Sequence, residues 1–167
     1  MSTKENLQAA FAGESQANRK YLAFAKKAET DGFPQIAKLF RAAAEAETVH
    51  AHAHLRVLNG VKTTKENLQE AAAGENHEFA TMYPGFIKTA KEEGNMEAEY
   101  SFNAAMAVEK IHHGLYTQAL KWIGESKDMP KADIYVCSVC GNTVTGSAPD
   151  KCPICGASKD KFTLITK

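Results

Sequence analysis

The sequence has few of the features that mark a secreted, membrane-bound or nucleic-acid-binding protein. Acidic and basic residues balance, 20 of each, so the charge favours neither a nucleic acid nor an anionic membrane as a partner. The polar N-terminus lacks the apolar segment of a signal peptide, and no later run is long and apolar enough to span a membrane. We therefore expect a soluble, cytoplasmic protein that binds neither nucleic acid nor membrane.

Cysteine is also scarce, and all four cysteines lie close together near the C-terminus. They form two C-x-x-C-G motifs, with metal-ligand candidates Cys137, Cys140, Cys152 and Cys155. In a cytoplasmic chain this spacing indicates a metal site rather than two disulfides. Thiolates three residues apart in a tight turn can share one metal, and the glycine lets the turn bend. Tetrahedral sulfur coordination suits both zinc and iron, so a structural zinc ribbon remains an alternative.

Proline and glycine, 5 and 11 residues, act mainly as boundaries. Residues 1–125 are rich in helix-forming Ala, Glu, Lys and Leu, interrupted by turns at 30–34, 59–63 and 93–95. This pattern predicts four helices, over roughly 4–30, 34–58, 64–92 and 95–123. Helices of matched length indicate a four-helix bundle.

The composition changes after residue 125. A polar linker covers 126–132, and residues 133–167 contain short β-type runs at 134–136 and 162–165 between glycines and cysteines. A segment this short buries little core and needs a metal to hold it together. Tyr135, Pro153 and Gly156 favour a rubredoxin-type iron there. We predict a bundle over 1–125, a linker over 126–132 and a cysteine domain over 133–167.

An internal repeat organises the helical part. The pentapeptide at 4–8 recurs at 65–69, and Ala-Gly-Glu at 12–14 recurs at 73–75, both at an offset of 61 residues. If one residue is inserted at the turn of the second half, Glu47-x-x-His50 matches Glu109-x-x-His112 at an offset of 62. The helical part is therefore predicted to be a duplicated hairpin.

Each half supplies one Glu from its first helix and a Glu-x-x-His from its second. Glu14 and Glu47 are equidistant from the first turn, and Glu75 and Glu109 from the third, so each pair should lie level. Apolar neighbours point these faces inward, where four carboxylates are tolerable only with cations among them. The alternative is solvated acids paired with lysines, but the symmetric set matches the di-iron carboxylate bundles. Glu78, one turn after Glu75, is an additional ligand candidate.

Taken together, the motifs resemble the rubrerythrin family along essentially the whole chain. They are Ala12–Gln16, Glu47-x-x-His50, Glu75–Glu78, Met82–Pro84, Glu109-x-x-His112 and the two cysteine motifs. The resemblance implies an all-α, ferritin-like four-helix bundle with a small C-terminal rubredoxin-like iron–thiolate domain. It also implies a non-haem peroxidase for oxidative stress defence, which reduces hydrogen peroxide to water.

The resemblance further implies three irons per chain. Two would form an oxo- and carboxylate-bridged pair, and one would be held by the four cysteines. Electrons would come ultimately from NAD(P)H through rubredoxin or a reductase. Carried over by motif, the ligands of the oxidised pair are Glu14, Glu47, Glu75, Glu78, Glu109 and His112, with Glu47 and Glu109 bridging.

Four residues would take further roles by the same resemblance. In the family one iron moves on reduction, releasing a Glu and taking a His, and the matching positions are Glu78 and His50. A released Glu78 would also carry protons. Tyr21 and Tyr83 match tyrosines that hydrogen-bond ligand carboxylates, with simple core packing as the alternative.

The link between the second and third predicted helices is only about six residues long. Six residues reach ~20 Å at most, whereas the flanking helices are ~40 Å long. We therefore expect a domain-swapped homodimer in which hairpins of two chains pair, with an up-down-up-down monomer as the alternative.

Two rival functions remain. One is a ferroxidase or iron-handling protein that uses O2, against which the cysteine domain counts. The other is a non-enzymatic protein with zinc at the cysteines.

Overall fold

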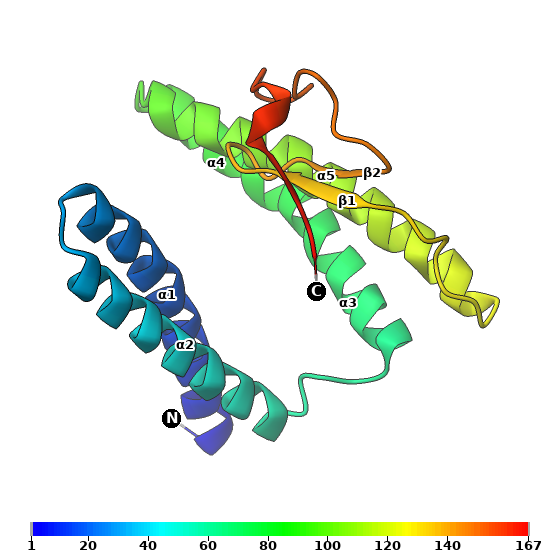
Figure 1. Ribbon diagram of the computed structural model, residues 1–167. Helices are drawn as coiled ribbons and strands as arrows, with labels where there is room; N and C mark the ends of the chain where they lie inside the picture. The colour runs from blue at the N-terminus through cyan, green and yellow to red at the C-terminus, as the bar shows by residue number, and fades with distance from the viewer. Residues whose placement is uncertain (1, 167) are drawn as a thin grey trace. The chain divides into compact units, whose positions relative to one another are not determined.

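The computed structural model describes residues 2–166, which divide into two compact units (Figure 1). The first unit ends at Lys62 and is an antiparallel pair of helices, α1 (Thr3–Thr30) and α2 (Pro34–Val57). The second begins at Thr63 and contains α3 (Thr64–His77), η1 (Glu78–Met82), α4 (Tyr83–Glu92) and α5 (Met96–Gly124). No helix among residues 2–166 combines the length and apolarity that crossing a membrane requires.

The two hairpins begin with the same capping arrangement, as their repeated sequence requires. Ser2 caps α1 and Thr63 caps α3, and each hydroxyl accepts a hydrogen bond from the backbone N–H of the Glu three residues on. The side chains of Glu5 and Glu66 reach back to the N–H groups of the capping residues. This reciprocal cap satisfies backbone groups that a helix start leaves unpaired.

The hairpin turns also match. Gly32 and Gly94 adopt positive φ angles of 83° and 69°, which end α1 and α4 in the same way. The predicted boundaries of the first, second and fourth helices agree with the structure to within a residue or two. The third predicted helix is wrong as one continuous α-helix, because the π-helical turn η1 separates α3 from α4.

The π-helical turn also shows where the extra residue in the second half of the repeat lies. The turn glycines Gly32 and Gly94 are already 62 residues apart, whereas Glu14 and Glu75 are 61 apart. The extra residue therefore precedes the turn and lies where η1 widens the helix, since a π-turn accommodates one residue more than an α-turn. The predicted insertion at the turn is wrong.

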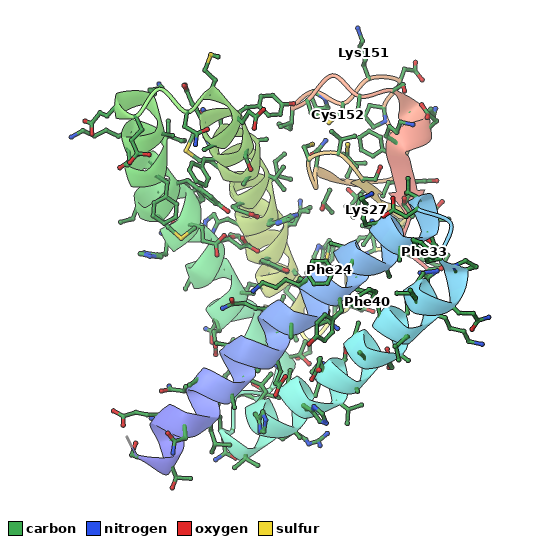
Figure 2. All side chains as sticks on the ribbon, turned by 90° about the vertical axis from the view of Figure 1, so that its left-hand side faces the viewer. Phe24, Lys27, Phe33, Phe40, Lys151 and Cys152 are labelled. Carbon is green, nitrogen blue, oxygen red and sulfur yellow. The ribbon has the colours of Figure 1, made fainter. Side chains whose placement is uncertain are left out.

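The two hairpins have the same aromatic packing near their turns. Tyr21, Phe24 and Phe40 cluster in the first, where Figure 2 shows Phe24 beside Phe40, with ring centroids 5.6 Å apart. Tyr83, Phe86 and Phe102 form the equivalent cluster in the second, with Phe86 and Phe102 also 5.6 Å apart. Each residue of the first cluster lies 62 positions before its equivalent in the second.

The C-terminal segment of the second unit forms a three-stranded antiparallel sheet in the order β2-β1-β3. The strands are β1 (Ile134–Cys137), β2 (Thr143–Thr145) and β3 (Phe162–Leu164), with a short 3-10 helix η2 (Lys159–Lys161) before β3. Tyr135 in the central strand pairs with Val144 on one side and Leu164 on the other. The prediction identified β1 and β3 but not β2, which lies against α5.

Candidate metal centres

The first hairpin brings together Glu14 from α1 with Glu47 and His50 from α2. One ligand atom of each lies within 4.8 Å of the others. His50 Nδ1 is 3.0 Å from Glu47 Oε2, while 56% of the His50 side chain is exposed against 17% for Glu47. Two carboxylates and an imidazole are donors that suit a divalent first-row metal such as iron.

The second hairpin repeats this arrangement with Glu75 from α3 and Glu109 and His112 from α5. Their ligand atoms also lie within 4.8 Å of one another. His112 Nδ1 is 2.8 Å from Glu109 Oε2 and 3.7 Å from Glu75 Oε1, so the ring turns Nδ1 toward both acids. The two related groups of Glu, Glu and His fit the donor set of a carboxylate-rich iron pair, one group per hairpin.

The carboxylates of the second group repel one another. Burial raises the pKa of Glu75 to about 7, with further contributions from the charge of Glu109, a hydrogen bond to it, and the charge of Glu78. A carboxyl group that holds its proton to near neutrality is in surroundings that lack positive charge. A bound cation would supply it, which fits the donor set.

Glu78 and Tyr83 both follow Glu75 along the chain, in η1 and at the start of α4. Glu78 is in η1, half-buried, and its charge acts on Glu75 and on Tyr83. Burial and then the charges of Glu78, Glu109 and Glu75 raise the pKa of the Tyr83 phenol. The Tyr83 phenol is therefore close enough for the charges of all three acids to raise its pKa. Tyr21 takes the equivalent place beside Phe24 and Phe40 in the first hairpin.

The four cysteines form a single cluster in the C-terminal segment. The Sγ atoms of Cys137 and Cys155 are 3.8 Å apart, and those of Cys140 and Cys152 are 3.6 Å apart. A tetrahedron with metal–sulfur bonds of about 2.3 Å has edges of about 3.8 Å. The sulfur positions therefore fit one tetrahedral metal ion.

The glycines after each cysteine pair have the role that the sequence predicts. Gly141 and Gly156 adopt φ angles of 84° and 75°, in the left-handed region that favours glycine. Each donates its backbone N–H to the carbonyl of the first cysteine in its motif, Cys137 or Cys152. The tight turns thus present both thiols of a pair to the same point.

The thiols of the cluster differ in acidity. Burial raises the pKa of Cys152, but backbone N–H groups of Cys155 and Ile154 and the neighbouring thiols outweigh it and lower the pKa to about 6. Burial raises the pKa of Cys140 to about 12, with neighbouring thiols adding to the increase against a backbone hydrogen bond from Asn142. One thiolate forms readily and further ionisation is resisted, which favours a cation at the centre.

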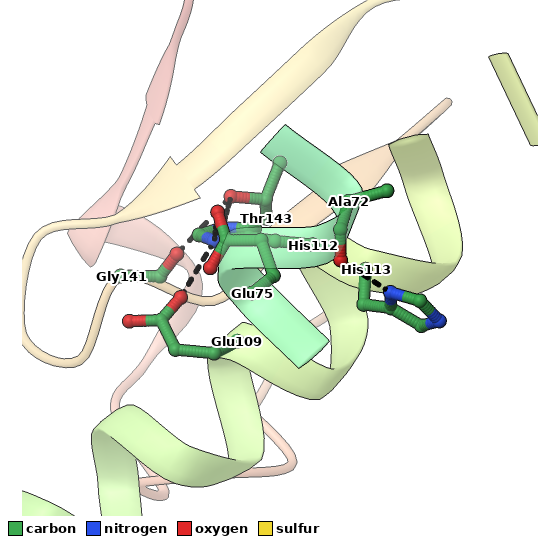
Figure 3. A network of polar contacts seen from close by, with 7 residues as sticks. All are labelled: Ala72, Glu75, Glu109, His112, His113, Gly141 and Thr143. Carbon is green, nitrogen blue, oxygen red and sulfur yellow. Dashed lines mark hydrogen bonds and ion pairs between the residues drawn. The ribbon is translucent and has the colours of Figure 1, made fainter. Parts of the chain in front are cut away.

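Two polar contacts that the sequence did not suggest support the groups of acids. Asn18 is buried and donates through Nδ2 to Ala44 O at 2.7 Å and Thr48 Oγ1 at 2.9 Å, which ties α1 to α2 beside Glu47. His113 Nδ1 lies 2.9 Å from Ala72 O and links α5 to α3 (Figure 3). The second hairpin has no asparagine at the matching position, so the repeat gives no signal for Asn18.

A third unforeseen contact joins the helices to the cysteine segment. His112 Nε2 lies 2.8 Å from Thr143 Oγ1 on β2, and that hydroxyl lies 3.1 Å from the carbonyl oxygen of Gly141 (Figure 3). Thr143 is 31 residues beyond its partner. No motif in the sequence connects the two.

Comparison with known proteins gives two family matches. Residues 5–120 match the family described as Rubrerythrin, and residues 135–163 match the rubredoxin-like domain of rubrerythrin. Together these matches confirm the predicted fold class, a ferritin-like four-helix part followed by a rubredoxin-like sheet that carries four cysteines. The predicted boundaries at 125 and 133 stay predictions.

Individual relatives match along nearly their whole length. Rubrerythrin-2 of Clostridium acetobutylicum is 38% identical, with 96% of this chain and 95% of that protein covered. Nigerythrin of Nitratidesulfovibrio vulgaris is 40% identical, with 97% and 86% covered. The solved structure of fully reduced, all-ferrous nigerythrin matches with a TM-score of 0.59 and 37% identity, covering 99% of this chain and 87% of that one. This chain therefore belongs to the rubrerythrin family of non-haem iron proteins.

Proposed function

We propose that this protein is a non-haem di-iron peroxidase that reduces hydrogen peroxide to water. The balanced reaction takes one peroxide, two protons and two electrons to two waters. The observation that carries the proposal is the duplicated donor group: Glu14, Glu47 and His50 in one hairpin, and Glu75, Glu109 and His112 in the other. Two ferrous ions held by these groups would supply one electron each and act as Lewis acids toward the peroxide oxygens.

The acids of the chain would divide the remaining work. Glu47 and Glu109 would bridge the metals, and Glu14 and Glu75 would bind one each. Glu78 would be the exchangeable ligand and proton carrier, because it lies within electrostatic reach of Glu75 and Tyr83. Tyr21 and Tyr83 would orient the carboxylates by hydrogen bonds.

His50 would take the place that Glu78 leaves when the pair is reduced. Within residues 2–166 its ring hydrogen-bonds to Glu47 alone, whereas the His112 ring is held at both nitrogens, by Glu109 and Thr143. The difference between the two histidines supports one mobile and one fixed imidazole ligand.

The four-cysteine cluster supports a redox duty rather than iron storage. An iron bound by four thiolates accepts and donates one electron, so it would pass electrons singly to the di-iron pair. We propose rubredoxin or an NAD(P)H-dependent reductase as the external donor. A ferroxidase would need no such supply of electrons.

We also propose that the working form is a domain-swapped homodimer. Six residues, 58–63, join the last residue of α2 to the first of α3. They reach ~20 Å, whereas the 24-residue helix α2 is ~36 Å long. The first hairpin also keeps large apolar side chains exposed, including Phe33, Ile36 and Leu39, which a hairpin of a second copy would cover.

Complementation between chains tests the swap. A Glu14→Ala chain and a Glu109→Ala chain would each lack one ligand, but a swapped heterodimer would contain one intact set. Co-expression with random pairing should then restore about a quarter of the wild-type sites. The matched control pairs Glu14→Ala with Glu47→Ala, both in the first hairpin, and should restore none. Failure of the first pair, or a monomeric mass in solution, would exclude the swap.

Rapid mixing tests the activity itself. Fully reduced protein is mixed anaerobically with hydrogen peroxide or with O2, and reoxidation of each iron type is followed by absorption. The proposal expects faster reoxidation by peroxide. Faster reoxidation by O2 would favour a ferroxidase, and zinc at the cysteines in protein isolated from its native cells would remove the electron path.

A further inference from the structure

The ring of His112 is held from both sides, which distinguishes it from its counterpart. Nδ1 faces Glu109 and Glu75, while Nε2 meets Thr143 Oγ1 at 2.8 Å (Figure 3). Among residues 2–166, the His50 ring hydrogen-bonds to Glu47 alone. The cysteine-bearing segment therefore contacts one of the two matched histidines.

The direction of this hydrogen bond follows from a count of hydrogens. The carbonyl oxygen of Gly141 can only accept, and Thr143 Oγ1 lies 3.1 Å from it, so the single hydroxyl hydrogen of Thr143 points there. Toward His112 the hydroxyl then offers a lone pair, and Nε2 must carry the hydrogen. In the metal-free chain a hydrogen lies between Nδ1 and Glu109 Oε2, which are 2.8 Å apart; a bound iron would take the place of this hydrogen, and an imidazole that keeps Nε2–H would then present its Nδ1 lone pair to the metal.

We propose that Thr143 is a positioning residue for the metal ligand His112, fixing the ring and the tautomer that present the Nδ1 lone pair to iron. The proposal rests on the di-iron function proposed above. Hydrogen-bond partners on the far nitrogen of ligating histidines typically orient the ring and raise its basicity. Here the partner comes from β2, so the cysteine segment prepares a ligand of the helical metal site.

Mostly apolar side chains line the space beside this contact. Thr143 and His112 lie on the wall of a cavity of about 290 Å³, lined also by Leu68, Leu115 and Met129. Apolar walls leave few other partners for Nε2, so the threonine hydroxyl has little competition. The same hydroxyl reaches Gly141, whose N–H bonds to Cys137 O, and so connects the ring to the turn that holds two cysteines.

Three substitutions separate positioning from packing. Thr143→Val keeps the shape of the side chain and removes the hydroxyl, and Thr143→Ser keeps the hydroxyl. Thr145→Val, on the same strand and the same cavity, is the matched control, because no side-chain hydrogen bond of Thr145 occurs within residues 2–166. Thr143→Ala is a second hydroxyl-free variant in case valine disturbs the fold.

The first readout does not depend on bound iron in the helices. With diamagnetic zinc in the cysteine site, nitrogen-15 NMR should show the His112 Nε2 hydrogen protected from exchange in wild type, Thr143→Ser and Thr145→Val. In Thr143→Val and Thr143→Ala this hydrogen should exchange rapidly with water. Protection that survives loss of the hydroxyl would overturn the proposal.

The second readout is the affinity of the helical site for ferrous iron, measured by competition with a chelator. Loss of the hydroxyl should weaken binding about 10- to 100-fold, whereas Thr143→Ser and Thr145→Val should stay near wild type. Equal weakening in Thr145→Val, or none in Thr143→Val, would overturn the proposal. If wild-type protein binds ferrous iron normally but does not turn over peroxide, that result would count against the proposed function and leave this inference intact.

Discussion

The burial of Glu75, together with the negative charges of Glu109 and Glu78 beside it, predicts that Glu75→Gln stabilises the metal-free protein. In the folded chain Glu75 keeps its proton to about pH 7, whereas the ordinary value is 4.5. Each pKa unit corresponds to about 1.4 kcal/mol, so ionised Glu75 costs at most about 3.5 kcal/mol. Because solvent reaches part of the group and screens it, we expect about 2 kcal/mol.

The effect of Glu75 on the free energy of unfolding changes with pH in a definite direction. Between about pH 4.5 and 7 the folded chain binds more protons than the unfolded chain, so the free energy of unfolding falls as pH rises through this window. The full penalty is present above about pH 7, and glutamine removes it. Glu75→Gln should therefore stabilise the metal-free protein most at about pH 8 and much less at about pH 5.

Urea unfolding followed by circular dichroism measures this effect, on protein with iron removed from the carboxylates and the cysteine site loaded. Glu45→Gln is the matched control, because Glu45 is exposed on α2. In iron-loaded protein the sign should reverse, since Glu75→Gln then removes a ligand. A metal-free Glu75→Gln protein no more stable than wild type at about pH 8 would refute the argument from burial and charge repulsion.

One deletion and two other substitutions test neighbouring features. Deletion of Ala80 from η1 should convert the π-turn to an α-turn and restore the seven-residue spacing that separates Glu14 from Tyr21 in the first hairpin, so the protein should keep its helical content by circular dichroism; a loss of helix would contradict this. Glu78→Gln should keep iron binding largely intact but slow peroxide turnover at least about tenfold if Glu78 carries protons, and unchanged stopped-flow rates would exclude that role. Asn142→Ala should remove the hydrogen bond to Cys152 Sγ and lower the reduction potential of the cysteine iron by up to about 60 mV, as voltammetry would show.

Much of the fold was predictable because it is encoded locally. The capping sequences before α1 and α3, the turn glycines and the cysteine motifs each act within a few residues, and the structure has them where the sequence places them. The repeat then made the groups around Glu47 and Glu109 predictable, because equal spacing from a turn fixes which residues of an antiparallel pair lie level.

The unpredicted features depend on contacts or helix geometry that spacing does not reveal. Glu75 and Glu78 are three residues apart whether the helix is α or π, so their spacing gave no sign of η1. Thr143 becomes important only through a partner far away in the chain, on another type of element. Asn18 fills a seam between helices, where a polar residue looks no different from one on a solvated face.

The π-turn accounts for the one-residue difference in length between the two halves of the repeat. A single added codon would ordinarily rotate everything beyond it by about 100° and misplace the core. Here η1 absorbs the added residue, so Tyr83 and Phe102 keep the 6.2 Å ring spacing of Tyr21 and Phe40. The second hairpin thus carries Glu78 where the first has Ala17, while the two aromatic frameworks match, so two hairpins with the same packing present unequal sets of acids.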